Sequence, residues 1–158
     1  MHSRIFQVSE EPISKDNLIN KDKYNENFVG SIADYVSEVE YESEQIEDLK
    51  WLSKATEGIK VDIEKGTITI ISKRMYFDEK HDKFKSILEK LQDITLEEFI
   101  TTDNSFDMYE LKKAYENEYG FYIDDNNEHF GLIPLDNWVR NAEENKVYYL
   151  GTIIDYHY

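Results

Sequence analysis

VYYLGTIIDYHY, residues 147–158, is the stretch that decides the fold of this 158-residue chain. Successive side chains of a strand point to opposite faces of a sheet. Here apolar side chains occupy both sets, since Tyr148 and Ile154 alternate with Val147 and Ile153. The pattern predicts a long central strand that is covered on both sides, or on one side by the chain and on the other by a partner.

A β-hairpin is the clearest element in the middle of the sequence. Apolar and polar residues alternate over residues 59–63, the sequence EKG at residues 64–66 makes the turn, and TITII at residues 67–71 returns. Two further short strands are predicted, at residues 4–8 and 121–124. Together with the C-terminal strand they form a sheet of about five strands.

Helices are predicted where apolar residues recur at a spacing of three and four. These segments are residues 28–36, a helix that follows an N-cap at Ser43, and residues 74–91, 95–100, 105–119 and 134–145. The shortest of them begins with the capping-box pattern of Thr95 and Glu98. Pro134 suits the first position of the last helix, in which Leu135, Trp138, Val139 and Ala142 face inward.

Three further expectations concern the long helical region. His81 falls on the apolar stripe of residues 74–91, so we expect a hydrogen-bonded core histidine. Met108, Leu111 and Tyr115 are expected to face inward from residues 105–119. Gly120 is the expected C-terminal stop of that helix.

The order of the main elements is β-α-α-β-β-α-α-β-α-β. It predicts a single α+β domain over residues 1–158, with a mixed or antiparallel sheet and helices packed on it. A chain of this length can bury a sizeable core without disulfides or a metal. Its aromatic content of 14 % distinguishes it from disordered acidic tails, which lack aromatic residues.

Charge is the most unusual property of the composition. Thirty-four Asp and Glu residues face eighteen Lys and Arg, which gives a formal net charge of −16. The net charge is −8 over residues 1–49, +3 over residues 50–90 and −11 over residues 91–158. Phosphates of nucleic acids and anionic lipid surfaces would repel this chain, so neither is an expected partner.

Other features narrow the class of protein. The chain has no cysteine, so it forms no disulfide and no cysteine zinc site. The N-terminal residues lack the apolar region of a signal peptide, and no apolar run is long enough to span a bilayer. We therefore expect a cytoplasmic protein.

Acidic residues gather in three stretches without any Lys or Arg, at residues 34–48, 91–111 and 114–139. Crowding of like charges costs stability, and such a surface can speed association with a basic partner. The partner-binding residues predicted on this basis are Glu38, Glu40, Glu42, Glu44, Glu47, Asp48, Asp103, Asp107, Glu110, Asp124, Asp125 and Glu128. The simpler alternative is a solvated face that only keeps the protein soluble.

No catalytic or metal-binding motif accompanies these acids. A calcium loop that starts at Asp124 would place His129 where glycine is needed and Leu135 where a bidentate Glu is needed. The four histidines are scattered along the chain. The sequence therefore predicts no catalytic residue, no metal site and no cofactor. A catalytic site formed by residues that are far apart in the sequence stays an alternative.

Several segments resemble a family of short acidic proteins that Gram-positive gut bacteria encode, often on phages or integrative elements. The segments are RIFQV and EPI at residues 4–8 and 11–13, GSIADYV at 30–36, AYE at 114–116, GFYID at 120–124 and IDYHY at 154–158. The resemblance implies a genetic context and no catalytic residue. Small acidic proteins of such elements include anti-CRISPR and anti-restriction inhibitors, and some of these imitate the phosphates of DNA.

The sequence thus favours a non-enzymatic acidic inhibitor that occupies the basic nucleic-acid channel of a bacterial defence nuclease. Its expected partner is a basic protein surface, and the protein itself is a monomer or a homodimer. One alternative is an immunity protein that neutralises a basic toxin nuclease. The other is a small enzyme or ligand-binding domain whose site is invisible in the sequence.

Overall fold

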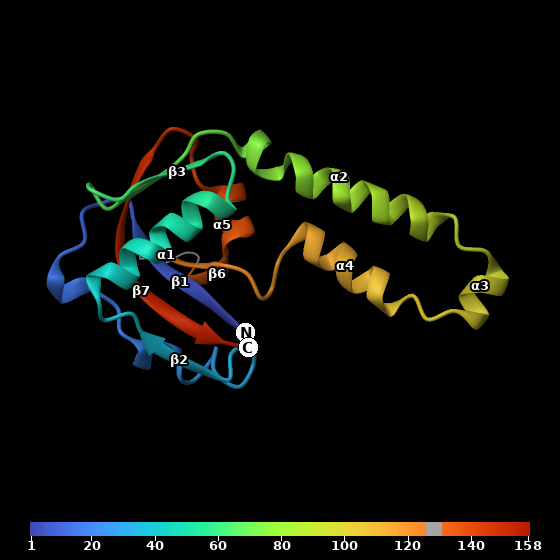
Figure 1. Cartoon of the computed structure of the whole chain (residues 1–158), viewed down its shortest axis with the longest axis horizontal. Coiled ribbons are helices and arrows are strands. Elements are labelled where there is room, and N and C mark those ends of the chain that lie inside the picture. Colours follow the sequence, from blue (N-terminus) through green and yellow to red (C-terminus); the bar gives the residue numbers. More distant parts are fainter. Residues whose placement is uncertain (126–130) are drawn as a thin grey trace.

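The body of the protein is a mixed β-sheet (Figure 1), seen in a computed structural model that describes residues 1–125 and 131–158. Seven strands of the described residues form it, in the order β3-β4-β7-β1-β5-β6, and β2 pairs with a different part of β7. Among these seven strands, only β1 and β5 pair in parallel. The strands are β1 His2–Ser9, β2 Tyr35–Glu38, β3 Ile59–Asp62, β4 Thr67–Ile70, β5 Tyr122–Asp125, β6 Gly131–Pro134 and β7 Val147–His157.

The prediction of a central C-terminal strand is confirmed. β7 pairs with β1 along one edge, and with β4 and β2 along the other. Ile153 belongs to a core cluster that also contains Leu52 and Trp138, whereas Ile154 belongs to a second cluster with Phe28. Neighbouring side chains of a strand point to opposite faces, so β7 is covered on both faces of the sheet.

The prediction of a helix over residues 28–36 is wrong. Phe28 and Ala33 are buried, but the backbone between them forms tight turns in which the Phe28 carbonyl accepts the N–H groups of Ile32 and Ala33. Gly30 adopts a φ of 85°, which lies outside the helical region. The chain then enters β2. The sequence does not predict this strand, because the apolar residues over residues 28–36 recur at helical spacing.

The hairpin is confirmed, and helices are present near two of the predicted positions in the body. β3 and β4 pair from Ile59↔Ile70 to Asp62↔Thr67. The helices are α1 Glu42–Ala55 and α5 Leu135–Asn141, and two short 3₁₀ helices, η1 Lys15–Asn17 and η2 Lys21–Tyr24, precede them. Leu52 of α1 and Trp138 of α5 are among the largest fully buried side chains. The N-cap of α1 is Tyr41 and not Ser43, and α5 ends at Asn141 and not near residue 145. The sequence predicts Pro134 at the first position of the last helix, but Pro134 is the N-cap of α5, which begins at Leu135.

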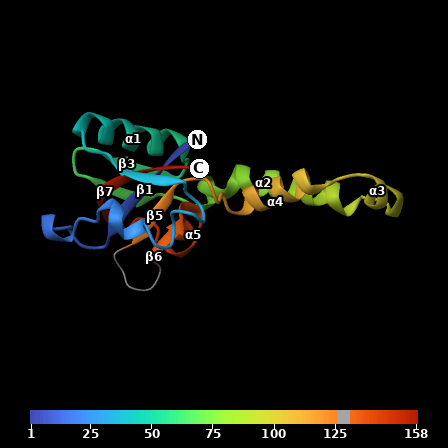
Figure 2. The same cartoon turned by 90° about the horizontal axis from the view of Figure 1, so that it is seen from below.

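Three helices project from the body as an arm, which we define as residues 73–115. α2 Lys73–Gln92 and α4 Ser105–Tyr115 lie side by side, and α3 Leu96–Thr101 lies at the far end (Figures 1 and 2). A helix of the length of α2 spans about 30 Å. The predicted capping box at the start of α3 is present, with Thr95 and Glu98 bonding each other's backbone N–H groups.

The arm is only two helices thick, which overturns several expectations of burial. His81 is not a core histidine, because its side chain is 68 % exposed. Met108 and Tyr115 are exposed as well, and α4 ends at Tyr115, before Gly120. A helix that packs against a single neighbour buries one narrow seam, so the rest of its apolar residues face solvent.

Asp136 of α5 joins the arm to the body. Its buried carboxylate accepts hydrogen bonds from the Tyr76 hydroxyl (2.8 Å), the Lys80 ammonium (2.6 Å) and the backbone N–H of Asn117 (3.0 Å). Burial, reinforced by this carboxylate, raises the pKa of Tyr76 far above its usual value. The contact therefore connects α5, the start of α2 and the segment that follows α4.

Acidification is expected to loosen the far end of the arm before the body unfolds. Hydrogen bonds from the Thr95 backbone and side chain lower the pKa of Glu98, and those from Ser105 lower the pKa of Asp103. A carboxyl whose pKa is lower in the folded state stabilises that state above its unfolded pKa, and the contribution disappears as pH falls through the folded pKa. Hydrogen exchange measured between pH 7 and about pH 3 should therefore show α3 and the start of α4 losing protection first. Uniform loss of protection across the chain would contradict this.

Candidate protein-binding surface

The predicted acidic residues divide into three groups along the chain, and the first of them contains five exposed carboxylates close together in sequence. We define the acidic ridge as Glu38, Glu40, Glu42, Glu44 and Glu47, all of which are exposed. The ridge runs from the end of β2 into α1. Glu42 and Glu44 lie in the first helical turn, where carboxylates interact favourably with the helix dipole.

Little positive charge neutralises the acidic ridge. Among the described residues, no Lys or Arg side chain forms an ion pair with Glu40, Glu42 or Glu44. Glu47 contacts the Lys50 ammonium at 3.3 Å, in an exposed pair of little energetic weight. Glu38 accepts the backbone N–H of Lys21 at 3.3 Å.

A groove of about 500 Å³ lies beside the ridge, between α1 and the ends of β1, β2 and β7. Glu38, Glu44 and Glu47 of the ridge contribute to its lining. Asp48, the sixth predicted acid of this region, is buried and bonds the Arg4 guanidinium at 2.7 Å. Arg4 also pairs with Asp155, so Asp48 anchors α1 to the sheet and is not part of the exposed surface.

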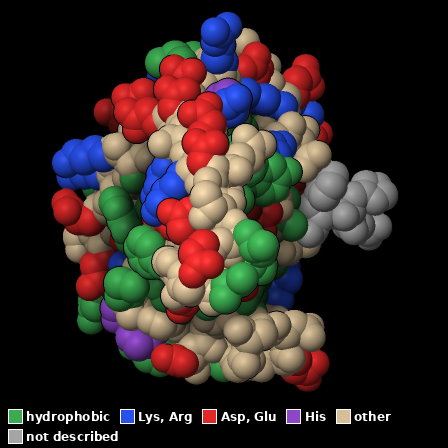
Figure 3. All heavy atoms as spheres, turned by 90° about the vertical axis from the view of Figure 1, so that its right-hand side faces the viewer, with side chains coloured by type: hydrophobic (Ala, Val, Ile, Leu, Met, Phe, Trp, Pro, Cys, Tyr) green, Lys and Arg blue, Asp and Glu red, His purple; other side chains and the backbone are tan. Residues whose placement is uncertain are grey.

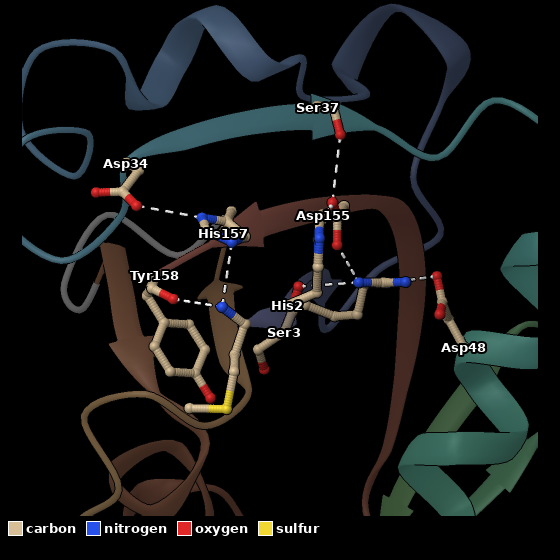
Figure 4. A network of polar contacts seen from close by, with 10 residues as sticks. His2, Ser3, Asp34, Ser37, Asp48, Asp155, His157 and Tyr158 are labelled. Atoms are coloured by element: carbon tan, nitrogen blue, oxygen red, sulfur yellow. Dashed lines mark hydrogen bonds and ion pairs between the residues drawn. The ribbon is translucent and has the colours of Figure 1, made fainter.

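A polar network holds β2 against β7 at the mouth of this groove (Figure 4). His2 Nδ1 lies 2.9 Å from Asp155, and His157 Nδ1 lies 3.2 Å from Asp34. The Ser37 hydroxyl donates to Asp155 at 3.4 Å. No local pattern of residues predicts this network, because strand pairing alone brings His2 opposite His157.

The second group of acids lies on the arm, and most of them bond other residues of the arm. Lys90 contacts Asp107 at 2.7 Å and Lys83 contacts Glu110 at 2.5 Å, so both pairs tie α4 to α2. Asp103 accepts the backbone N–H of Ser105 at the start of α4. Asp107 and Glu110 therefore contribute less unpaired charge than the sequence suggested, whereas Asp103 is exposed and no described Lys or Arg pairs with it.

The third group does not form the expected exposed patch. Asp124 is fully buried and accepts hydrogen bonds from the Tyr24 hydroxyl (2.7 Å) and the Lys23 ammonium (2.8 Å). Burial, followed by the charge of Asp124, raises the pKa of Tyr24. Asp125 is half-buried at the end of β5, and Glu128 lies outside the described residues.

A second pocket, of about 290 Å³, lies where the arm meets the body. Trp51, Phe121, Tyr119 and Tyr158 give it aromatic walls. It is the place that the ligand-binding alternative would use. Its charged groups, Lys80 and Asp136, bond each other, so they act first as the junction between arm and body.

Residues 1–125 and 131–158 contain no cluster of three or more His, Asp or Glu side chains arranged to hold a metal ion. None of their helices combines the length and the apolar character needed to cross a membrane.

Comparison of the chain with protein-family models, with curated proteins and with solved structures finds no match. The resemblance to acidic proteins of mobile elements therefore stays a prediction, and the function is argued from the geometry of the molecule.

Proposed function

We propose that this protein is a non-enzymatic binding protein whose acidic ridge docks on the basic surface of a bacterial nucleic-acid-binding protein. In this proposal the ridge occupies a channel that normally holds nucleic acid, as an anti-CRISPR or anti-restriction inhibitor would. The single observation that supports it most is the placement of five exposed carboxylates within ten residues, four of them without a cationic partner in the described chain. The encounter is expected in the cytoplasm.

Carboxylates on a fixed scaffold can replace phosphates as ligands of arginine. The guanidinium group binds both anions through two parallel hydrogen bonds. Here the ridge is held by β2, which pairs with β7, and by α1, which Asp48 anchors to Arg4. A surface that is already ordered loses little conformational entropy when it binds. The large negative charge of the whole chain would in addition speed the encounter with a basic protein.

Reversing the ridge should weaken binding more than reversing the same number of charges elsewhere. The triple variant Glu40→Lys, Glu42→Lys and Glu44→Lys is compared with a control, Glu11→Lys, Glu57→Lys and Glu64→Lys, whose native side chains are also exposed. The assay measures DNA cleavage by a purified CRISPR effector and by a restriction enzyme as the protein is titrated. We expect the ridge variant to lose about tenfold or more in inhibition at low salt, with a flatter dependence on salt concentration.

The control variant changes the net charge by the same amount, so it retains any effect of overall charge. It should inhibit within a few-fold of the unmodified protein. Equal inhibition by both triple variants would show that the ridge is a solubilising face, and the proposal would then fail.

A further inference from the structure

The far end of the arm carries large apolar side chains that nothing in the described chain covers. We define the arm end as residues 93–106. Within it, Leu96, Phe99, Ile100 and Phe106 are 75 %, 74 %, 69 % and 70 % exposed. Single exposed apolar residues are ordinary, but four large ones gathered at the end of a projection mark an interaction site.

The arm does not need these side chains for its own packing. α2 and α4 contact each other, and their less exposed apolar side chains include half-buried Phe84, Ile87, Leu91 and Leu111 and buried Ala114. Leu96, Phe99 and Ile100 are spaced i, i+3 and i+4 along α3, so they share one face of that helix. A helix of six residues is too short to be stable by itself, and its capping box holds it while this face points to solvent.

Carboxylates lie close along the chain to the residues of the apolar face. Asp93, Glu97 and Asp103 are exposed, and the sequence contains no Lys or Arg from residue 91 to residue 111. Figure 3, which looks onto the arm end, shows apolar and acidic side chains next to one another. A complementary surface is therefore an apolar groove with lysines or arginines along its rim.

This charge pattern decides between the occupants that an apolar face could have. In a two-fold pairing of two copies, the same patch would face itself and its carboxylates would meet. Anionic lipid headgroups would repel the same carboxylates. An amphipathic basic protein surface satisfies both the apolar face and its acidic rim.

We propose that the arm end is a second docking site, which inserts the apolar face of α3 into a basic-rimmed apolar groove of a protein partner. α2 carries this face about 30 Å away from the body, so it can enter a concave surface while the body stays outside. The site is separate from the acidic ridge, which lies on the body, and either site can be changed without the other.

The test uses a fluorescent synthetic peptide that forms a helix with leucines on one face and lysines and arginines flanking them. A second peptide has the same composition in an order that produces no apolar face. Binding to both peptides is measured by fluorescence anisotropy. The unmodified protein should bind the amphipathic peptide at least tenfold more tightly than the reordered one.

The arm-end variant Leu96→Ser, Phe99→Ser and Ile100→Ser should lose this preference. A control with exposed apolar residues changed elsewhere, Leu18→Ser and Ile71→Ser, should keep it. The ridge triple variant should also keep it, so failure of this proposal and failure of the proposed function are distinguishable. Circular dichroism shows whether each variant retains its helices.

Three results would overturn the proposal. Equal affinity for both peptides would mean that charge alone attracts them. Dimerisation in sedimentation velocity that the arm-end variant abolishes would identify a second copy as the occupant. Binding to phosphatidylglycerol vesicles that the same variant abolishes would identify a membrane.

Discussion

Replacing Asp136 with alanine is expected to detach the base of the arm from the body and to lower the free energy of unfolding by about 3 kcal/mol. Removing one partner of a buried ion pair typically costs about 3–5 kcal/mol, because the other charge is left without compensation. Here the loss should lie at the lower end, since Lys80 is partly exposed and can turn to water. The Tyr76 hydroxyl and the Asn117 N–H lose their acceptor at the same time.

Urea denaturation measures the loss of stability, and hydrogen exchange locates it. Exchange should quicken at the start of α2 and around residue 117, while β1 and β7 keep their protection. Asp136→Asn should lose less, because its side-chain oxygen can still accept a hydrogen bond. A matched control is Asp78→Ala, an exposed acid on α2, which should change stability by no more than about 0.5 kcal/mol. A loss for Asp136→Ala as small as that of the control would contradict the role given to this junction.

Elements with a strong local pattern could be predicted from the sequence. The hairpin has alternating apolar and polar residues and a glycine in its turn, and β7 has apolar residues on both faces. Each element can therefore be recognised from a stretch of about twelve residues. β2 could not be recognised in this way. Its four residues are polar or partly exposed, and it exists because β7 offers a free edge beyond the end of β4.

Periodicity also could not reveal what lies opposite an apolar face. The stripe on α2 includes Phe84 and Leu91, and it does contact α4. His81, Met108 and Tyr115 would be buried only if another layer covered the arm, and the described chain provides none. A pattern in the sequence shows that a helix has an apolar side but not how much of that side is covered.

The acidic residues of the candidate surface could be predicted from the sequence. Which of them pair with a Lys or Arg could not be predicted. Arg4 reaches Asp48 across 44 residues, Lys83 reaches Glu110 across 27, and Lys23 reaches Asp124 across 101. Local charge counting cannot find such pairs, because chain folding creates them. Four of the five ridge carboxylates form no ion pair, because the chain from residue 34 to residue 48 contains no Lys or Arg and no described cation from elsewhere pairs with them.

Asp124→Ala is the prediction with the next largest effect, and it should reduce stability without changing binding. Asp124 is fully buried at the point where β5 meets η2, and it accepts from the Tyr24 hydroxyl and the Lys23 ammonium. The variant leaves the buried Tyr24 hydroxyl without an acceptor, which costs about 1–3 kcal/mol. Lys23 is half exposed and can be hydrated, so the expected loss is about 2 kcal/mol.

A double-mutant cycle with Tyr24→Phe separates the hydrogen bond from the packing around it. Once the hydroxyl is absent, Asp124→Ala should cost less than it does alone, because no unpaired donor remains. Asp16→Ala, an exposed acid in the neighbouring η1, serves as a control and should leave stability nearly unchanged. Inhibition by the Asp124→Ala protein, measured where it is still folded, should equal that of the unmodified protein, because the carboxylate lies inside the fold. A loss of inhibition with unchanged stability would contradict this prediction and would indicate that Asp124 contacts the partner.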